Sequence, residues 1–285
     1  LEFFLAQMDR PQIKGNLFLH FELIPDRLPE ALCELLPAFP PGTLQFEIGI
    51  QSFNPEVQQR ISRKQNHEKT TANLRWLVTH THAHVHADLI FGLPGESLES
   101  FGRGFDELYK LGPQEIQVGL LKRLRGTPIT RHTEPFGMCY MPTPPYRIMA
   151  TRDADFSTIQ RMVRFARYWD LIGNSGRFPN TLPLLLGESP FERFLALSDW
   201  IFASSTQTHK ISLQRLFEML HDGVPLLPAT DQTLVTEALS SDYTHNALKG
   251  RPVWHTAATS KTGQTSTRKG NRRQQRHLPD EASLH

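Results

Sequence analysis

The chain of 285 residues is 39% hydrophobic and 21% charged, a balance typical of a folded, water-soluble protein and unlike that of a disordered chain. Its 31 basic and 29 acidic residues leave a formal net charge of +2, so the total charge predicts no general binding to nucleic acid or to membranes. The two cysteines, Cys33 and Cys139, exclude a disulfide framework and a four-cysteine metal site within this chain. No apolar run is long enough for a membrane helix, and we expect a cytoplasmic protein.

Short aliphatic segments bounded by Gly, Pro or polar residues predict four buried strands, at 17–23, 43–50, 85–91 and 115–121. Each is followed or preceded by a helical pattern, at 27–38, 54–62, 68–80 and 97–111. This alternation predicts βαβ units and a parallel sheet. Because a closed eight-stranded barrel needs about 250 residues, the expected fold class is α/β, with half of a parallel TIM-like barrel in residues 1–134.

The rest of the chain has a different character. Four prolines and the lack of any period predict a linker over residues 135–152. Further helical patterns predict an all-α domain over 153–255, with helices at 153–172, 190–204, 211–222 and 231–241. Residues 256–285 hold six Lys or Arg against two acidic residues and few apolar ones, so we expect a disordered basic tail.

Polar residues follow or interrupt three of the predicted strands. Glu22 ends the first strand, Gln51 follows the second, and Asp88 lies in the third. Sites of parallel α/β proteins lie at the carboxyl ends of the strands. Buried polar side chains there need partners, so a satisfied internal network explains any one of them. All three at corresponding positions favour ligand binding.

Residues 46–65 (FEIGIQSFNPEVQQRISRKQ) and 87–97 (ADLIFGLPGES) resemble the second half of the radical S-adenosylmethionine (SAM) barrel, in the pattern of oxygen-independent coproporphyrinogen oxidases. The resemblance implies that Glu22, Gln51, Arg63 and Asp88 bind SAM. Carboxylates and an amide suit the ribose and ammonium groups of SAM, and an arginine suits its carboxylate. Neither a catalytic residue nor a metal ligand is assigned.

The resemblance also implies a [4Fe–4S] cluster held by three thiolates of a CxxxCxxC segment. Cys33 and Cys139 cannot supply that segment. The sequence begins at Leu1 in mid-pattern, and in this family the cluster segment precedes the matched part. We therefore expect a C-terminal fragment that is inactive alone, or a non-catalytic binding or scaffold remnant as the alternative.

The helical segments 166–178, 190–202 and 207–220 resemble a C-terminal domain of unknown function found on bacterial cobalamin-binding radical SAM proteins. That resemblance implies cobalamin, held by a domain outside this chain, and a reaction that includes methyl transfer among its alternatives. It does not identify the substrate, which is either a small molecule or a macromolecule. Four aromatic residues of these segments have the spacing of a helical core, namely Trp169, Phe191, Phe194 and Trp200.

Other features suggest weaker hypotheses. His80, His82, His84 and His86 alternate, and an extended chain would place them on one face suited to Zn or Ni, but the predicted helix end there favours solvated histidines. His86 shares its parity with Asp88 and is a candidate substrate contact. The basic tail has no aromatic residue to stack on bases, so it gives little reason to expect nucleic-acid binding. A cut barrel exposes strand edges, so we expect self-association of the isolated chain.

Overall fold

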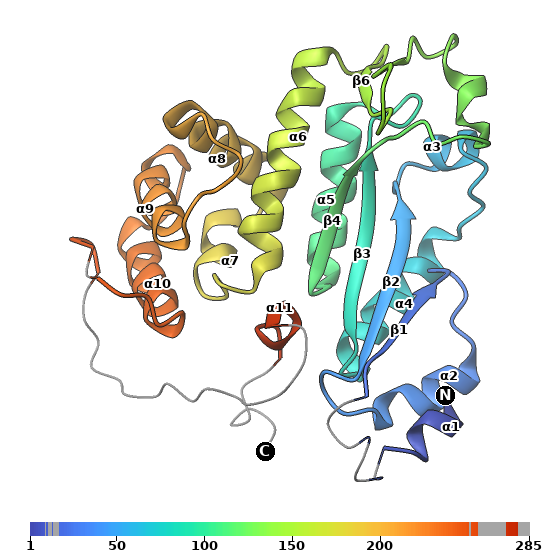
Figure 1. Cartoon of the computed structure of the whole chain (residues 1–285), viewed down its shortest axis with the longest axis horizontal. Coiled ribbons are helices and arrows are strands. Elements are labelled where there is room, and N and C mark those ends of the chain that lie inside the picture. The colour runs from blue at the N-terminus through green and yellow to red at the C-terminus, as the bar shows by residue number, and fades with distance from the viewer. Residues whose placement is uncertain (9, 11–12, 14–16, 251, 256–271, 279–285) are drawn as a thin grey trace. The chain divides into compact units, whose positions relative to one another are not determined.

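The computed structural model describes residues 1–8, 10, 13, 17–250, 252–255 and 272–278. The chain forms two compact units. The first comprises Leu1–Gln160 and Arg268–His285, and the second comprises Arg161–Thr267. Figure 1 shows the chain with its elements labelled.

A four-stranded parallel sheet forms the centre of the first unit, with the strand order β1-β2-β3-β4. The strands are β1 (Leu19–Leu23), β2 (Leu44–Gln51), β3 (His84–Phe91) and β4 (Glu115–Leu120). The connecting segments contain α2 (Glu30–Leu35), η1 (Leu36–Ala38), α3 (Pro55–Arg60), α4 (His67–His80) and α5 (Leu98–Leu111), and the short α1 (Glu2–Leu5) precedes the sheet. The predicted α/β class with a parallel sheet is confirmed, and each predicted strand and helix of this part exists within a few residues of its expected bounds.

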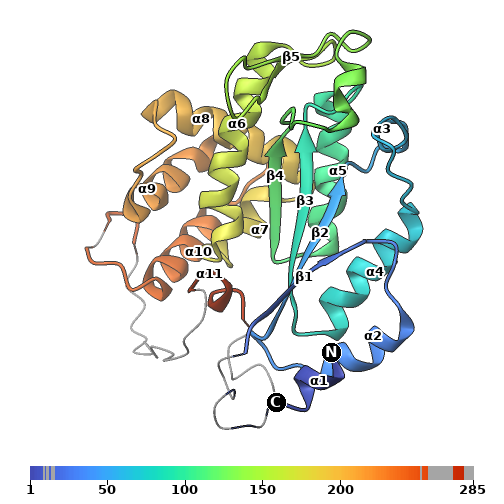
Figure 2. The same cartoon turned by 45° about the vertical axis from the view of Figure 1, so that its right-hand side comes forward.

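The two faces of the sheet differ in chemistry because side chains alternate along a strand. In β2, buried residues such as Phe46 and Ile48 alternate with half-buried ones. The apolar face packs against the helices, where the rings of Phe91 in β3 and Phe101 in α5 lie 5.3 Å apart. Figure 2 shows α4 and α5 on this side of the strands. The opposite face is polar, and the register places on it His20, Glu22, Gln45, Glu47, His84, His86, Asp88, Glu115 and Gln117.

The helices on the apolar side begin at residues that the sequence marks as caps. The side chain of Asn54 accepts hydrogen bonds from the backbone at the start of α3, Asn66 does so for α4, and Ser97 does so for α5. Helix α5 ends at Gly112, whose φ of +74° belongs to the left-handed region that favours glycine. These local signals explain why the helix starts match their expected positions.

Residues 135–152, expected to be a linker, contain a small antiparallel hairpin of β5 (Cys139–Tyr140) and β6 (Ile148–Ala150), preceded by η2 (Pro128–His132). Tyr140 and Ile148 pair across the hairpin and are buried. The prolines at 142, 144 and 145 lie in the turn that joins the two strands of this hairpin. Two- and three-residue strands are too short to show a period, which is why the sequence gives no strand signal here.

The second unit is built from helices in the part that the structure describes. They are most of α6 (Phe156–Leu171), then η3 (Gly173–Ser175), α7 (Thr181–Leu186), α8 (Pro190–Ser205), α9 (Leu213–Gly223), η4 (Val224–Leu226) and α10 (Gln232–His245). The rings of Phe165, Trp169 and Phe194 pack within 5.0 to 6.3 Å of one another. The predicted packing role of Trp169 and Phe194 agrees with these contacts.

A fully buried carboxylate holds two helices of this unit together. Asp242 in α10 is 0% exposed, and its side chain accepts hydrogen bonds from both the backbone and side chain of Asn180 and of Thr181, at 2.7 to 3.3 Å. These residues begin α7, so Asp242 satisfies backbone groups that the first turn of a helix leaves without partners. Sequence periodicity does not find this contact, because 61 residues separate Asp242 from Thr181.

The expectation of disorder over 256–285 falls mostly on residues outside those that the structure describes. The described part of that segment, 272–278, contains the short helix α11 (Arg272–Gln275). No helix within the described ranges is both long and apolar enough to cross a bilayer.

Candidate functional site

Three of the four residues expected to bind a ligand lie in strands of the sheet, and the fourth lies in a connecting segment. Glu22 lies near the end of β1, exposed and opposite Glu47. Gln51 is the last residue of β2, and Asp88 lies in the middle of β3. Arg63 follows α3 and is half-buried. Asp88 is paired with Gly49, and Nε2 of Gln51 lies 3.0 Å from where a Cβ of Gly49 would be, so Gln51 and Asp88 lie on the same side of the sheet.

Gly49 is the point at which three of these side chains meet. Asp88 is its partner across the strands. A Cβ atom on Gly49 would lie 3.0 Å from Nε2 of Gln51 and 3.4 Å from Nη2 of Arg63, so the absence of a side chain leaves room for both groups. The register shifts between Gly49 and Gln51, and Gln51 has a φ of +72°. This bulge turns the Gln51 side chain over Gly49, a role for Gly49 that sequence reasoning missed.

Arg63 is fixed over the end of β2 by the backbone of Gly49. Its Nη1 donates to the carbonyl oxygen of Gly49 at 2.5 Å, and Nε2 of Gln65 donates to the same oxygen at 3.1 Å. Burial lowers the pKa of Arg63, and the charge of Asp88 acts in the opposite direction. A guanidinium remains charged under these conditions, so Arg63 presents a positioned cation beside Gln51 and Asp88.

Asp88 is the most strongly perturbed group on this face. Burial raises its pKa to about 7, helped by the charge of Glu47, a hydrogen bond with the Glu47 side chain and the charge of Glu22, while Arg63 acts to lower it. Two carboxyl groups that share a hydrogen bond cannot both ionise easily. Near neutral pH, Asp88 therefore exchanges readily between its protonated and ionised forms.

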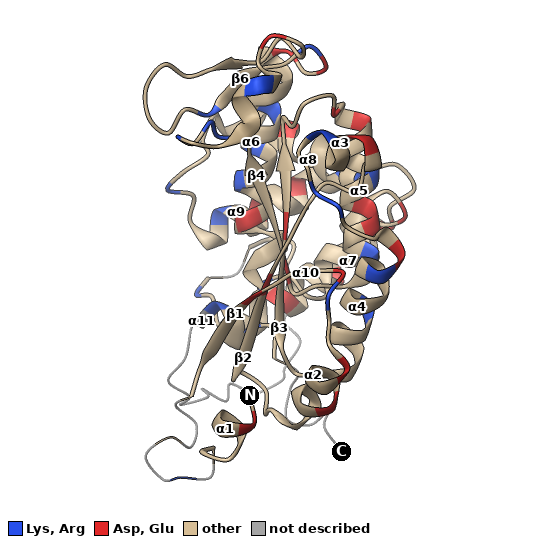
Figure 3. Cartoon of the chain, turned by 90° about the vertical axis from the view of Figure 1, so that its right-hand side faces the viewer, with Lys and Arg blue, Asp and Glu red and all other residues tan. Residues whose placement is uncertain are grey.

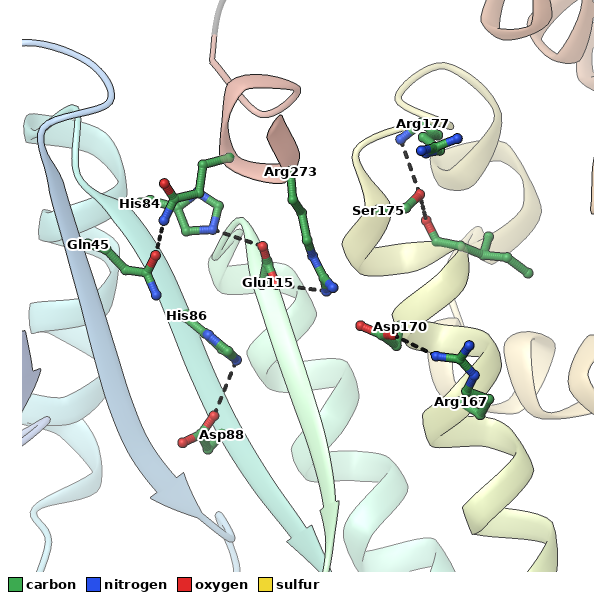
Figure 4. Close-up of polar contacts among 12 residues, drawn as sticks. Gln45, His84, His86, Asp88, Glu115, Arg167, Asp170, Ser175, Arg177 and Arg273 are labelled. Atoms are coloured by element: carbon green, nitrogen blue, oxygen red, sulfur yellow. Dashed lines mark hydrogen bonds and ion pairs between the residues drawn. The ribbon is translucent and has the colours of Figure 1, made fainter. Parts of the chain in front are cut away.

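Asp88 and its neighbour His86 each keep a buried polar atom without a hydrogen bond. Oδ1 of Asp88 lies 3.5 Å from Nε2 of His86, at ion-pair distance, and a dashed line joins the two atoms in Figure 4. Among the described residues neither atom makes a hydrogen bond. Burial lowers the pKa of His86, so its ring is neutral near pH 7. Buried polar atoms without hydrogen bonds are rare in folded proteins, so these two atoms have hydrogen-bonding capacity left for a polar ligand or a water molecule.

The polar groups nearer the start of the strands have partners within the protein. Nε2 of His84 lies 3.1 Å from Oε1 of Glu115, and Nη2 of Arg273 lies 2.8 Å from Oε2 of the same carboxylate (Figure 4). His84 and Glu115 are both buried. This part of the face is therefore a satisfied network.

The four alternating histidines do not converge. His80 stacks on Trp76 at 5.3 Å within α4, His82 is exposed, and His84 and His86 contact different carboxylates. Within the described residues no group of three or more His, Cys, Asp or Glu side chains is arranged to hold a metal ion. The helix ends at His80, which breaks the alternation that the metal hypothesis requires.

A cavity of about 230 Å³ opens beside Gln51 and Arg63 at the carboxyl end of the sheet. We call it the rim cavity. It is lined by Gln51, Ile61, Arg63, Ile90, Leu93, Leu121, Lys122, Thr127, Pro128, Ile129, Arg131 and His132. The position agrees with the general rule that parallel α/β proteins bind ligands at this edge.

A second perturbed carboxyl group lies on the apolar side of the same edge. Glu96 is 1% exposed, and burial raises its pKa to about 7 although Ser52 Oγ donates a hydrogen bond of 2.5 Å to Oε1. Its Oε2 has no hydrogen-bond partner among the described residues. Sequence reasoning missed Glu96 because its position, directly before the helix cap Ser97, suggests an exposed first turn.

Comparison with known families accounts for both units. Residues 134–284, more than half of the chain, match the family described as "Protein of unknown function (DUF4080)". This chain belongs to the DUF4080 family. Residues 2–108 of this DUF4080 protein, which lie within the first unit, match the Radical SAM superfamily. The resemblance of residues 46–65 and 87–97 to radical SAM proteins is confirmed at the level of the superfamily.

Curated proteins are similar to part of this DUF4080 protein. Anaerobilin synthase from Escherichia coli O157:H7 is 31% identical over 106 residues, which are 37% of this chain and 24% of that protein. Oxygen-independent coproporphyrinogen III oxidase from Pseudomonas aeruginosa is 34% identical over 77 residues, 27% of this chain and 17% of that protein. The chain thus spans a quarter or less of the length of these relatives.

A solved structure of coproporphyrinogen III oxidase (HemN) from Escherichia coli, described as a radical SAM enzyme, is 21% identical with a TM-score of 0.40 and covers 56% of this chain and 36% of its own.

Proposed function

We propose that this chain supplies the SAM-binding wall of a radical SAM enzyme, with Glu22, Gln51, Arg63 and Asp88 as the cofactor-binding residues. The observation that carries the proposal is the meeting of Gln51, Arg63 and Asp88 around Gly49, beside buried polar atoms without hydrogen-bond partners. The match of residues 2–108 to the Radical SAM superfamily supports it.

The residues fit the chemical groups of SAM. Arg63 presents a guanidinium to a carboxylate. Ionised Asp88 accepts hydrogen bonds from an ammonium or from ribose hydroxyls, and Glu22 adds a second carboxylate on the same face. The amide of Gln51 can both donate and accept. When bound and reduced by one electron, SAM supplies the radical chemistry of the superfamily, and these residues bind and orient it.

The cysteines of this chain do not fit a [4Fe–4S] cluster. Cys33 lies half-buried in α2, where burial raises the pKa of its thiol, and Cys139 is exposed in the hairpin strand β5. A cluster needs three or four thiolates close together. The proposal therefore assigns the cluster ligands to polypeptide outside this chain, and we expect no radical chemistry from this chain alone.

The finer parts of the proposal rest on the resemblance of the helical segments. This resemblance suggests a cobalamin-binding domain elsewhere in the protein and methyl transfer as one alternative for the reaction. It also suggests that the protein is bacterial and cytoplasmic. No residue of this chain is assigned to cobalamin. The alternative function, a non-catalytic binding or scaffold protein, is favoured by the cysteine content alone.

Equilibrium dialysis of labelled SAM tests the proposal without requiring turnover. We expect Asp88→Asn and Arg63→Gln each to weaken SAM binding by about tenfold or more, because each removes a hydrogen bond to a charged group. Arg125→Gln is the matched control, since Arg125 is exposed and does not line the rim cavity. Unchanged SAM affinity in both site variants, or no SAM binding by the folded wild-type chain, would contradict the proposal and favour the non-catalytic alternative.

A further inference from the structure

The segment after β4 supplies two cations to the lining of the rim cavity, Lys122 and Arg131. His132 lines the cavity beside them, and burial lowers its pKa. Residues 119–152 hold six Lys or Arg and a single acidic residue, Glu134, whereas the whole chain has a net charge of only +2. Figure 3 shows Lys and Arg around α3 and β6 at this end of the sheet.

Two of the cavity cations have no acidic partner. Within the described residues, no carboxylate forms an ion pair with Lys122 or Arg131, although Arg60 nearby pairs with Glu56 at 2.6 Å. Arg131 is nevertheless held in place, because its Nη2 donates to the carbonyl oxygen of Arg60 at 2.9 Å and to Oγ of Ser62 at 2.8 Å. An oriented guanidinium with no carboxylate to neutralise it is suited to an anion.

The remaining lining of the cavity is mainly aliphatic, from Ile61, Ile90, Leu93, Leu121 and Ile129. An apolar wall with a few placed polar groups is typical of small-molecule sites. The volume of about 230 Å³ is below that of sites that enclose a whole drug-sized ligand. The cavity thus suits one charged end of a ligand together with the apolar part next to it.

We propose that the rim cavity binds a carboxylate or phosphate group of the substrate, and that Lys122 and Arg131 select for this anionic group. The assignment of the bound molecule as substrate rests on the proposed function, in which Arg63 and Gln51, which also line the cavity, bind SAM. Lys122 supplies a mobile point charge, and Arg131 supplies a fixed guanidinium whose Nε and Nη2 donate within the protein, which leaves Nη1 for the anion. The substrate is then a small organic acid or phosphate ester with an apolar portion.

Thermal unfolding with citrate and with inorganic pyrophosphate tests the anion site directly. Each ion is titrated against sodium chloride of matched ionic strength, and the rise in Tm gives an apparent affinity. The chain with both Lys122→Gln and Arg131→Gln is compared with wild type, and Arg125→Gln is the control because it removes a charge from the same segment without touching the cavity. SAM dialysis is run on all three proteins.

We expect at least one of the two ions to raise the Tm of wild type beyond the sodium chloride control, and the double variant to lose about tenfold or more in apparent affinity. The Arg125→Gln protein should stay within about twofold of wild type. The ion that binds more tightly identifies carboxylate or phosphate as the preferred group. Equal affinity in wild type and the double variant, an equal loss in Arg125→Gln, or no stabilisation beyond sodium chloride would overturn the inference.

The SAM measurement separates this inference from the proposed function. If the double variant still binds SAM but no longer binds the anion, the result supports two separate sets of binding residues in one site. Anion binding that depends on Lys122 and Arg131 in a chain that binds no SAM would refute the proposed function and leave the anion site standing.

Discussion

The buried carboxyl group of Glu96 gives the sharpest test of the structure by itself, because replacing it with Gln should change stability in a pH-dependent way. Burial raises the pKa of Glu96 from an ordinary value of 4.5 to about 7 in the folded chain. This shift corresponds to about 3 kcal/mol. The folded state binds the proton more tightly than the unfolded state, so the free energy of unfolding falls as pH rises from the unfolded pKa to the folded pKa and stays low above it.

Glu96→Gln removes this titration and keeps the acceptor for Ser52 Oγ, which donates to Oε1 in the wild-type chain. At about pH 8 the variant should therefore be more stable than wild type by up to about 3 kcal/mol, and at about pH 5 the two should be nearly equal. Urea unfolding followed by tryptophan fluorescence at a series of pH values measures the free energy of unfolding of wild type and of the variant. Asp88 also titrates near pH 7, but it does so in both proteins and cancels in the difference.

Glu134→Gln is the control for this experiment, because Glu134 is exposed and its replacement should change stability little at any pH. A stability difference between wild type and Glu96→Gln that stays constant from about pH 5 to about pH 8 would show that the Glu96 carboxyl is hydrated or ionised throughout. The buried position described for Glu96 would then be refuted.

Other perturbations test the remaining parts of the structure. Gly49→Ala should lower SAM affinity by about tenfold in dialysis, because the added methyl group displaces the ends of the Gln51 and Arg63 side chains. The free energy of unfolding should change by less than about 1 kcal/mol, since these side-chain ends are flexible. An unchanged SAM affinity would count against the arrangement of Gln51, Arg63 and Asp88 around Gly49. SAM binding should strengthen as pH rises through about 7, because Asp88 binds a cation when ionised, and a flat pH profile would argue against its role. Asp242→Ala should cost roughly 3 kcal/mol in urea unfolding because it leaves buried donors unpaired, and a loss below about 1 kcal/mol would contradict the described network. The isolated chain should self-associate in sedimentation velocity over a dilution series, because among the described residues β1 pairs on one side only and Phe18 and Ile24 near its ends are 47% and 56% exposed; a monomer at every concentration would refute this.

The sequence predicts those features that repeat locally. Polar and apolar residues alternate through 44–51 and through 84–88, which assigns Glu47 to one face of its strand and His86 and Asp88 to one face of theirs. In the structure these residues do share a face, because the parallel register pairs Glu47 with His86 and Gly49 with Asp88. Polar residues at strand ends could therefore be placed together before any coordinates were known.

Features that depend on contacts between distant segments could not be predicted in this way. The Glu96 carboxyl is buried by residues near Ser52, 44 positions earlier, and the Asp242 carboxylate meets the start of a helix in another part of the chain. The bulge at Gln51 depends on a backbone shift that no side-chain pattern records. In each case the decisive contact is made by the tertiary fold, and local propensity does not encode it.

Some polar side chains on this face of the sheet have hydrogen-bond partners within the protein and others do not, and this difference indicates where a ligand binds. Parallel sheets are usually apolar on both faces, so a row of charged side chains on one face needs partners. Toward the start of the strands, His84 and Glu115 pair with each other and Arg273 completes the network. Near the middle of β3, Asp88 and His86 retain buried atoms without hydrogen bonds. Both groups share one face and one register, so the difference between them arises from what the chain itself supplies. Asp88 lies opposite Gly49, next to Gln51 and Arg63, which line the rim cavity, and this is where we expect a bound partner.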